Sequence, residues 1–224
     1  MFSSDAGLCI FDLDGTLVDT IQDLGNSMSY ALRELGLPVR TMEEYTRFVG
    51  NGTLLLAKRS LPDSLKEDEQ LLNKAHELFS GYYAVHYADN SRVYDGIQPV
   101  LDELRGRGVK LGVLTNKPDR FAKTIIEKLF PKGTFDIVLG SRDGVPKKPD
   151  PAAENEIIYA LGADKSRVFH LGDSDVDVFT AKNAGVRSIG CSWGFRSRQS
   201  LVDAGADFIA DRPWDICEIL LKNS

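Results

Sequence analysis

The stretch LCIFDLDGTLVDT spans residues 8–20, and the rest of the chain is organised around it. Its apolar run, residues 8–11, is typical of a buried β-strand. Two carboxylates follow at Asp12 and Asp14, and Gly15 then permits a sharp exit from the strand. Because residues i and i+2 of a strand point to the same face, these two carboxylates should lie side by side. Two ionised carboxylates in that position would repel each other unless a cation neutralises them or one of them holds a proton.

Such a carboxylate pair suits an active site that needs a nucleophile, a nearby acid or base, and a divalent metal. The simpler alternative is an acidic turn between a strand and a helix, because Asp and Gly are common turn residues. The length of this string and its place directly behind an apolar strand favour the active site.

Composition narrows the class of protein. The chain has 224 residues with a formal net charge of −6, so its surface offers no general attraction to nucleic acid or to membranes. No apolar run approaches the roughly 20 residues of a membrane helix, and the N-terminus lacks the pattern of a signal peptide. The three cysteines, Cys9, Cys191 and Cys217, are too scattered for a disulfide framework. We therefore expect a cytoplasmic protein with reduced thiols. The sequence leaves the choice between monomer and homodimer open.

Residues 17–93 have a helical pattern. Asp19 is expected to cap the first helix, and Thr41 with Glu44 forms a capping box for the second. No convincing strand is found as far as Asn90. The sequence therefore predicts an all-helical cap domain over residues 17–93, inserted into a core made of residues 1–16 and 94–224.

The core segment alternates short apolar runs with helical patterns. Predicted strands cover residues 109–114, 135–139, 168–171 and 186–191, and predicted helices cover residues 96–107, 118–130, 151–161 and 175–184, before a last helix, strand and helix. Alternation of this kind implies parallel strands joined by right-handed crossovers. The expected fold class is α/β, a doubly wound parallel sheet with helices on both faces.

In such sheets ligands bind beyond the carboxyl ends of the strands. Thr115 and Asn116 follow one predicted strand and could form a phosphate cradle, although both are also ordinary turn residues. The next loop, residues 146–151, places two lysines among three prolines. The prolines stiffen the backbone and favour a positioned ammonium group. Either Lys147 or Lys148 could supply it.

The strand over residues 168–171 is followed by carboxylates at alternate positions. Asp173, Asp175 and Asp177 would be costly together without a cation. Capping of the next helix by Ser174 or Asp175 is the simpler explanation, and it is compatible with a metal site.

Taken together, these motifs resemble those of the haloacid dehalogenase-like (HAD) phosphohydrolases, and especially the phosphoglycolate phosphatase branch. Residues 12–19 resemble the opening motif of that family, residues 148–151 its third motif and residues 172–177 its fourth. The lysine of the third motif corresponds to Lys148, which implies that Lys147 is the flanking, solvated residue. All four motifs occur in order, each at a predicted strand end, so the resemblance covers essentially the whole chain. It implies a Rossmann-like core of the HAD type with a helical cap.

The resemblance also implies a chemistry, that of a Mg²⁺-dependent phosphomonoester phosphatase. Asp12 would attack phosphorus and form an aspartyl-phosphate, while Asp14 would serve as the general acid and then the general base. Mg²⁺ would be held by the Asp12 side chain, the Asp14 carbonyl and the Asp173 side chain, while Asp177 would orient the site or the metal's waters. The groups expected to bind the phosphoryl group of the substrate are Thr115, Asn116 and Lys148.

The first candidate substrate is 2-phosphoglycolate. Arg47 and the turn at residues 50–52 could bind its carboxylate, or could simply be a solvated residue and a helix end. The alternatives are a β-phosphoglucomutase-like sugar phosphomutase, a sugar-phosphate phosphatase or a pyrophosphatase of the same superfamily, and a catalytically silent binding or regulatory protein. A dehalogenase is disfavoured because that branch lacks the second aspartate, which is present here as Asp14.

The remaining candidates are weaker. The three histidines are not expected to form a site: His170 lies in a predicted core strand, and His76 and His86 lie on a helix of the insert. The segment 193–196 follows another predicted strand, where it either borders the site or only packs against it.

Overall fold

A computed structural model describes residues 6–222 of the chain. The chain divides into two compact units. The larger unit combines the residues up to Val18 with those from Val93 onward, and the smaller unit is Asp19–Arg92. The predicted boundaries at residues 16 and 94 lie within two residues of this division. The assignment of the two units as catalytic core and cap is a functional one and stays a prediction.

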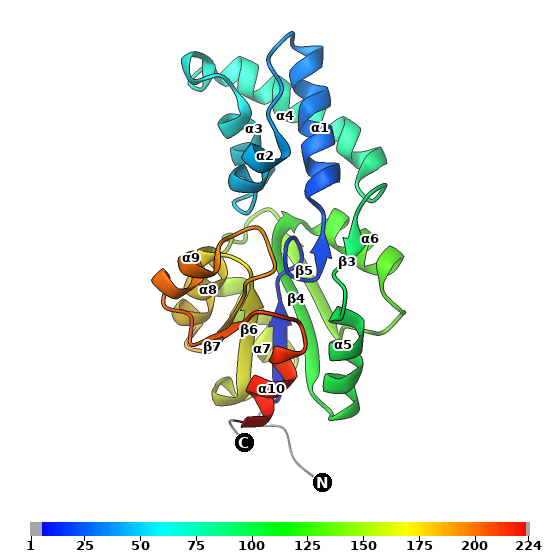
Figure 1. The fold of residues 1–224 in the computed structure, drawn as a ribbon, viewed down its shortest axis with the longest axis vertical. Coiled ribbons are helices and arrows are strands. Elements are labelled where there is room, and N and C mark those ends of the chain that lie inside the picture. The colour runs from blue at the N-terminus through cyan, green and yellow to red at the C-terminus, as the bar shows by residue number, and fades with distance from the viewer. Residues whose placement is uncertain (1–5, 223–224) are drawn as a thin grey trace. The chain divides into compact units, whose positions relative to one another are not determined.

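The larger unit is built on a parallel sheet (Figure 1). Within residues 6–222 its six strands follow the order β5-β4-β1-β6-β7-β8. The strands are β1 (Leu8–Phe11), β4 (Lys110–Pro118), β5 (Ile137–Ser141), β6 (Val168–Gly172), β7 (Arg187–Cys191) and β8 (Phe208–Ala210). Each neighbouring pair is parallel. The predicted doubly wound α/β fold is therefore confirmed.

Helices separate these strands along the chain, and one more helix follows β8. They are α5 (Ile97–Gly106), α6 (Asp119–Leu129), α7 (Ala152–Ala160), α8 (Asp175–Ala184), α9 (Arg198–Asp203) and α10 (Asp215–Lys222), with a 3₁₀ turn at Lys165–Arg167. Helix α8 ends at Gly185, which has the left-handed φ of 72° typical of a glycine C-cap. Within residues 6–222, no helix combines the length and the apolar character that crossing a bilayer requires.

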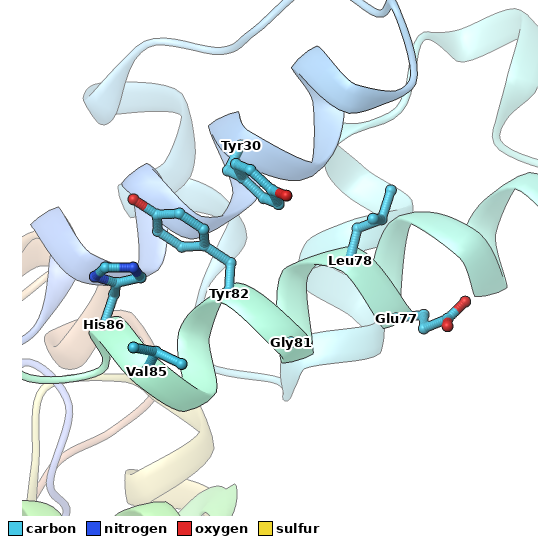
Figure 2. Close-up of a pocket in the computed structure, with 7 residues that line it drawn as sticks. All are labelled: Tyr30, Glu77, Leu78, Gly81, Tyr82, Val85 and His86. Atoms are coloured by element: carbon cyan, nitrogen blue, oxygen red, sulfur yellow. The ribbon is translucent and has the colours of Figure 1, made fainter.

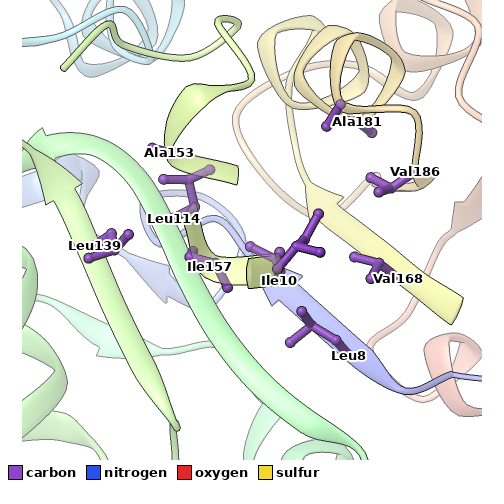
Figure 3. Close-up of a cluster of buried hydrophobic side chains, with 11 residues drawn as sticks. Leu8, Ile10, Leu114, Leu139, Ala153, Ile157, Val168, Ala181 and Val186 are labelled. Carbon is purple, nitrogen blue, oxygen red and sulfur yellow. The ribbon is translucent and has the colours of Figure 1, made fainter. Parts of the chain in front are cut away.

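The central strand β1 is buried on both faces. Leu8 and Ile10 pack on one side with Ile157 of α7 and Ala181 of α8 (Figure 3). The alternate residues of the strand, Cys9 and Phe11, are also fully buried. A strand covered on both faces reads as a continuous apolar run, which is why residues 8–11 could be identified from sequence.

The strand boundaries differ from prediction in one place that affects the site. Strand β4 continues to Pro118, where its pairing with β5 resumes at Ser141 after a register shift. Prediction ended this strand at residue 114, because Thr115 and Asn116 are common in turns. The extension places residues 115–117 in extended backbone and buries their side chains.

The smaller unit contains α1 (Ile21–Glu34), α2 (Met42–Phe48), α3 (Thr53–Ser60), α4 (Glu69–His86) and a 3₁₀ turn at Asp63–Leu65. Thr41 and Glu44 form the predicted capping box of α2. The expectation of no strand before Asn90 was wrong: Val18–Asp19 forms β2, which pairs with β3 (Arg92–Val93). A two-residue strand is too short to show an alternating pattern.

The predicted cap role of Asp19 is confirmed only in part. Thr20 occupies the N-cap position of α1 and makes no side-chain capping bond. Asp19 lies one residue before it. The Asp19 Oδ1 accepts a 3.4 Å hydrogen bond from the backbone N of Ile21, the first residue of α1, and its Oδ2 accepts a 2.8 Å hydrogen bond from Arg92 Nη2. The chain therefore leaves the larger unit through β2 and returns to it through β3, and the Asp19–Arg92 ion pair joins these two paired strands. A capping pattern reads only local spacing, so it does not reveal a partner that is distant in the sequence.

Candidate active site

The sheet order brings the predicted site residues to one edge. Strand β1 lies between β4 and β6. From β1 the next strand of this sheet along the chain is β4, on one side, whereas from β6 the next strand is β7, on the opposite side. Ligands of doubly wound sheets bind at such a switch point, beyond the carboxyl ends of the strands. Asp12 follows β1, Thr115 lies in the last part of β4, and Asp173 follows β6.

The contact at the centre of the site joins Lys148 to two carboxylates. Its Nζ donates to Asp12 Oδ1 at 2.8 Å and to Asp177 Oδ1 at 2.6 Å. All three side chains are buried, whereas Lys147 is exposed as predicted. Burial alone would lower the pKa of Lys148, but the two carboxylates outweigh that effect and raise it. The ammonium group is therefore held as a fixed positive charge.

Asp12, Asp173 and Asp177 form a buried acidic cluster. One carboxylate oxygen from each lies within 4.8 Å of those of the others. Burial raises the pKa of Asp12 to about 6, although Lys148 opposes the shift. Burial, and next the negative charges of Asp177 and Asp12, also raise the pKa of Asp173. These carboxylates are held close together at a cost that a bound cation would remove.

The hydrogen bonds of Asp177 distinguish it from the other two carboxylates. Its Oδ1 receives Lys148 Nζ and, at 3.3 Å, His170 Nε2, while its Oδ2 receives the backbone N and the Oγ of Ser174 at 3.1 and 2.6 Å. A carboxylate has about four acceptor positions, so these four donors occupy Asp177. Asp12 and Asp173 keep more of their acceptor capacity. Those two side chains are the ones that fit a hard cation.

Asp14 has a partner that the sequence did not reveal. Lys117 Nζ donates to Asp14 Oδ1 at 2.8 Å, and the lysine side chain is 2% exposed. Lysine is almost never so deeply buried unless it is paired. The signal that could have found it is its position two residues after Thr115. In a strand that continues to Pro118, this spacing puts both side chains on one face.

The side-chain amide of Asn116 contacts the backbone of Lys148. Lys148 N donates to Asn116 Oδ1 at 2.9 Å, and Asn116 Nδ2 donates to the Lys148 carbonyl at 3.1 Å. Asn116 thus holds the lysine loop beside β4. Thr115 Oγ1 accepts a hydrogen bond from Lys117 N at 3.2 Å, which leaves its hydroxyl hydrogen for another acceptor. Direct binding of a phosphoryl group by Thr115 and Asn116 stays a prediction.

His170 reaches the site through Asp177, which sequence reasoning missed. It is a satisfied core histidine, as predicted, but its partners are carboxylates: Glu154 Oε2 lies 2.6 Å from Nδ1, and Asp177 lies on the other side of the ring. Glu154 belongs to α7 and is fully buried. A buried glutamate on a helix carries no spacing signal that links it to a histidine in a strand.

The loop after β7 borders the site. Phe195 N donates to Asp173 Oδ2 at 2.6 Å, and Trp193 Nε1 donates to the Thr16 carbonyl at 3.1 Å. Gly194 lies between them, where a Cβ atom would overlap the Cβ of Asp173 and the carbonyl oxygen of Gly15. The loop after β7 therefore binds Asp173 through the Phe195 N–H and binds the motif after β1 through Trp193, and the position between these two contacts accepts only glycine.

Replacing Gly194 by alanine should displace Asp173. We expect Gly194→Ala to bind divalent cations at least about tenfold more weakly, because ligands lose affinity when their supporting contacts move. Isothermal titration with Mg²⁺ measures this, with circular dichroism as a check of folding. Gly106→Ala is the matched control, since a Cβ there meets nothing within 4 Å. Equal cation affinity in both variants would contradict the role given to this loop.

The helical unit has its own surface groove, separate from these residues (Figure 2). Its wall includes an aromatic stack in which the Tyr30 and Tyr82 ring centroids are 4.4 Å apart, and those of Tyr82 and His86 4.1 Å apart. None of the predicted catalytic or metal-binding residues lines this groove. It is therefore not the predicted catalytic site.

Comparison with known proteins agrees with this geometry. Residues 9–191 match the family described as haloacid dehalogenase-like hydrolase. The chain belongs to the haloacid dehalogenase-like hydrolase family. The matched range runs from β1 to β7, and so includes Asp12, Lys148 and Asp173. The family resemblance drawn from the four motifs is confirmed.

Relatives within this HAD family include a phosphoglycolate phosphatase of Vibrio parahaemolyticus, which is 34% identical over 98% of this chain and 98% of its own. A phosphoglycolate phosphatase of Pseudomonas putida is 36% identical over 84% of this chain and 70% of its own. A crystal structure from Haemophilus somnus, described as a predicted phosphoglycolate phosphatase, is 28% identical with a TM-score of 0.89. It covers 96% of this chain and 98% of its own.

Proposed function

We propose that this HAD hydrolase is a Mg²⁺-dependent phosphatase that hydrolyses a small phosphomonoester, most specifically 2-phosphoglycolate to glycolate and phosphate. The observation that carries the proposal is the buried Lys148 ammonium, shared by Asp12 and Asp177 at the switch point of the sheet. A carboxylate nucleophile held by a fixed cation, beside further carboxylates, is an arrangement that suits phosphoryl transfer.

The donor set fits Mg²⁺. This hard cation prefers oxygen ligands, and the Asp12 and Asp173 carboxylates supply them. The family resemblance adds the backbone carbonyl of Asp14. Once bound, Mg²⁺ supplies positive charge against the phosphoryl oxygens and relieves the repulsion between the carboxylates. Asp177, with its oxygens already occupied, orients Lys148 and stays outside the metal's ligand set.

The protein groups then have distinct roles. An Asp12 oxygen attacks phosphorus to form the aspartyl-phosphate as the bond to the leaving alcohol breaks, and protonated Asp14 gives that alcohol its proton. Ionised Asp14 next takes a proton from the water that attacks phosphorus, which releases phosphate and regenerates Asp12. Lys117 orients the Asp14 carboxylate for both steps. Lys148 and the Thr115 hydroxyl balance the charge of the transferring group.

We assign the helical unit Asp19–Arg92 the role of a cap that selects the substrate. Arg47 is largely exposed and pairs with Glu43 at 3.5 Å, so its predicted contact with a substrate carboxylate would require it to exchange partners. The turn after α2 is held by Arg59, whose Nη1 donates to the Phe48 carbonyl at 2.8 Å and to Asn51 Oδ1 at 2.9 Å. Arg59 therefore positions the turn, and Arg47 stays a candidate for substrate contact.

A substrate panel tests the proposed function. We expect kcat/KM for 2-phosphoglycolate to exceed that for hexose phosphates and an aryl phosphate by at least about tenfold, since a carboxylate in the substrate adds a charge-assisted contact. Phosphate release with and without Mg²⁺ is measured, in wild type and in Arg47→Ala. Loss of the preference in Arg47→Ala would assign that residue to the carboxylate, and an unchanged preference would remove it.

Two controls separate the alternatives. Diphosphate is included as a substrate, and a sugar bisphosphate primer is added to a sugar monophosphate. Formation of an isomer in place of inorganic phosphate would contradict the phosphatase and identify a mutase. Faster hydrolysis of neutral-tailed sugar phosphates would reject 2-phosphoglycolate while leaving the phosphatase chemistry intact. Failure to hydrolyse any ester would favour a silent binding protein.

A further inference from the structure

A continuous row of charged groups runs from the interior of the larger unit to the nucleophile. Glu154 contacts His170, His170 contacts Asp177, and Asp177 shares Lys148 with Asp12. The side chains of Glu154 and His170 are at most 1% exposed. The proposed chemistry uses Asp12, Lys148 and Asp177 but gives no role to the two groups behind them.

The geometry around His170 defines its protonation state. Nδ1 lies 2.6 Å from Glu154 Oε2, and Nε2 lies 3.3 Å from Asp177 Oδ1, so each ring nitrogen faces a carboxylate oxygen. A neutral imidazole would turn one lone pair toward a carboxylate, whereas an imidazolium donates from both nitrogens. Burial alone would lower the pKa of His170, and the Lys148 charge also opposes protonation. The carboxylates of Glu154 and Asp177 outweigh both and raise that pKa to about 9.

This protonated ring affects Lys148 through a shared atom. Asp177 Oδ1 accepts from both His170 and Lys148, and Lys148 divides its charge between that atom and Asp12. If His170 stopped donating, Asp177 would draw more strongly on Lys148, and Lys148 would contact Asp12 less. The nucleophile would then lose part of the charge and orientation that the lysine provides.

We propose that Glu154 and His170 are positioning residues for the reaction: Glu154 keeps His170 as a donor to Asp177, which in turn leaves Lys148 free to hold the nucleophile Asp12. The catalytic consequence rests on the proposed phosphatase function. The ionic state of the row and the placement of Lys148 do not depend on turnover, so they can be tested separately.

An apolar replacement of the pair distinguishes positioning from structural support. Replacing a buried ion pair by packed apolar residues of similar volume is often neutral or stabilising. The double variant Glu154→Leu/His170→Val therefore keeps the fold and removes both charges. Leucine suits helix α7, and valine suits strand β6. His86→Gln is the control for a histidine change elsewhere, because His86 pairs with Asp89 at 2.7 Å on the helical unit and both of these side chains are exposed.

We expect the double variant to unfold cooperatively at or above the wild-type Tm. Its kcat for an aryl phosphate should fall roughly 10- to 100-fold, the usual effect of removing a supporting contact behind a reactive group. KM should change by less than about threefold, and His86→Gln should match wild type. A stable double variant with wild-type kcat would overturn the proposal, since a merely structural pair would give that result.

Nuclear magnetic resonance gives a readout that needs no turnover. The chain has three histidines, so the ring nitrogens of His170 can be assigned by comparison with a Glu154→Gln variant. Wild-type His170 should remain doubly protonated through pH 8 and lose its proton at lower pH in Glu154→Gln. The Lys148 ammonium signal should shift in Glu154→Gln and not in His86→Gln. A neutral His170 at pH 7, or an unshifted Lys148 signal, would overturn the proposal even if no substrate had been found.

Discussion

The variant Asp12→Asn should lose essentially all phosphate release, with kcat for an aryl phosphate falling by more than about 10³-fold. The amide has nearly the shape of the carboxylate but lacks the negative charge that attacks phosphorus. Removal of a covalent nucleophile is among the largest single effects known in enzymes. The wild-type enzyme, quenched in acid during turnover, should carry a phosphoryl group on Asp12 that mass spectrometry can locate. Asp12→Asn should carry none.

Asp175→Asn is the matched control for this experiment. Asp175 stands two residues from Asp173 and is exposed, so the same change of charge there should leave kcat within about twofold of wild type. The folded state of both variants is checked by thermal unfolding. If Asp12→Asn hydrolysed the aryl phosphate at the wild-type rate, or if the phosphoryl group were found on another residue, the covalent mechanism would be rejected.

The residues that could be predicted from sequence are those whose position follows from a general rule. An apolar run such as residues 8–11 marks a buried strand, and parallel strands place their carboxyl ends at one edge. These two rules bring Asp12 and Asp173 together without knowledge of any side-chain contact. Lys148 was identified by the resemblance of residues 148–151 to the third family motif, because the flanking prolines restrict the backbone of both lysines alike.

The side chains of Lys117, Glu154 and His170 were not predicted to take part in the site. Their partners are distant in the chain, and the spacing between them follows neither a helix nor a strand periodicity. Lys117 contacts Asp14, which is 103 residues away, and only the continuation of β4 to Pro118 buries it there. Glu154 falls within a predicted helix and His170 within a predicted strand. Neither pattern indicates that the two side chains form a buried ion pair. Their contact depends on how α7 packs on the sheet, which secondary-structure patterns do not specify.

Asp19 shows what a local capping pattern leaves out. Its spacing from Gln22 resembles a local capping pattern, and its Oδ1 accepts a hydrogen bond from Ile21 N at the start of α1. Its other oxygen binds Arg92 at the far end of the insert, which the local pattern does not indicate. An inserted unit brings its two boundaries together, so residues at its ends acquire partners from a distant part of the chain. Local capping rules are therefore least dependable where a domain leaves and rejoins another.

Lys148→Ala should lower kcat/KM by at least about a hundredfold, whereas Lys147→Ala should leave it within about twofold. Lys148 is buried between Asp12 and Asp177, so its loss leaves two carboxylates without their common cation. Lys147 is exposed, where substitutions usually have small effects. The two lysines are neighbours in one loop, so each variant controls for changes in the loop itself.

The Lys148→Ala variant should also differ in stability and in pH dependence. Breaking a buried ion pair by removing one partner typically costs about 3–5 kcal/mol, so thermal unfolding of the metal-free variant should occur at a clearly lower temperature. Lys148 lowers the pKa of Asp12, against the effect of burial. Without it that pKa rises, and Asp12 is ionised only at higher pH, so the acidic limb of kcat/KM should move upward. Equal small effects of Lys148→Ala and Lys147→Ala on activity, Tm and pH profile would mean that this loop is a basic surface turn with no part in catalysis.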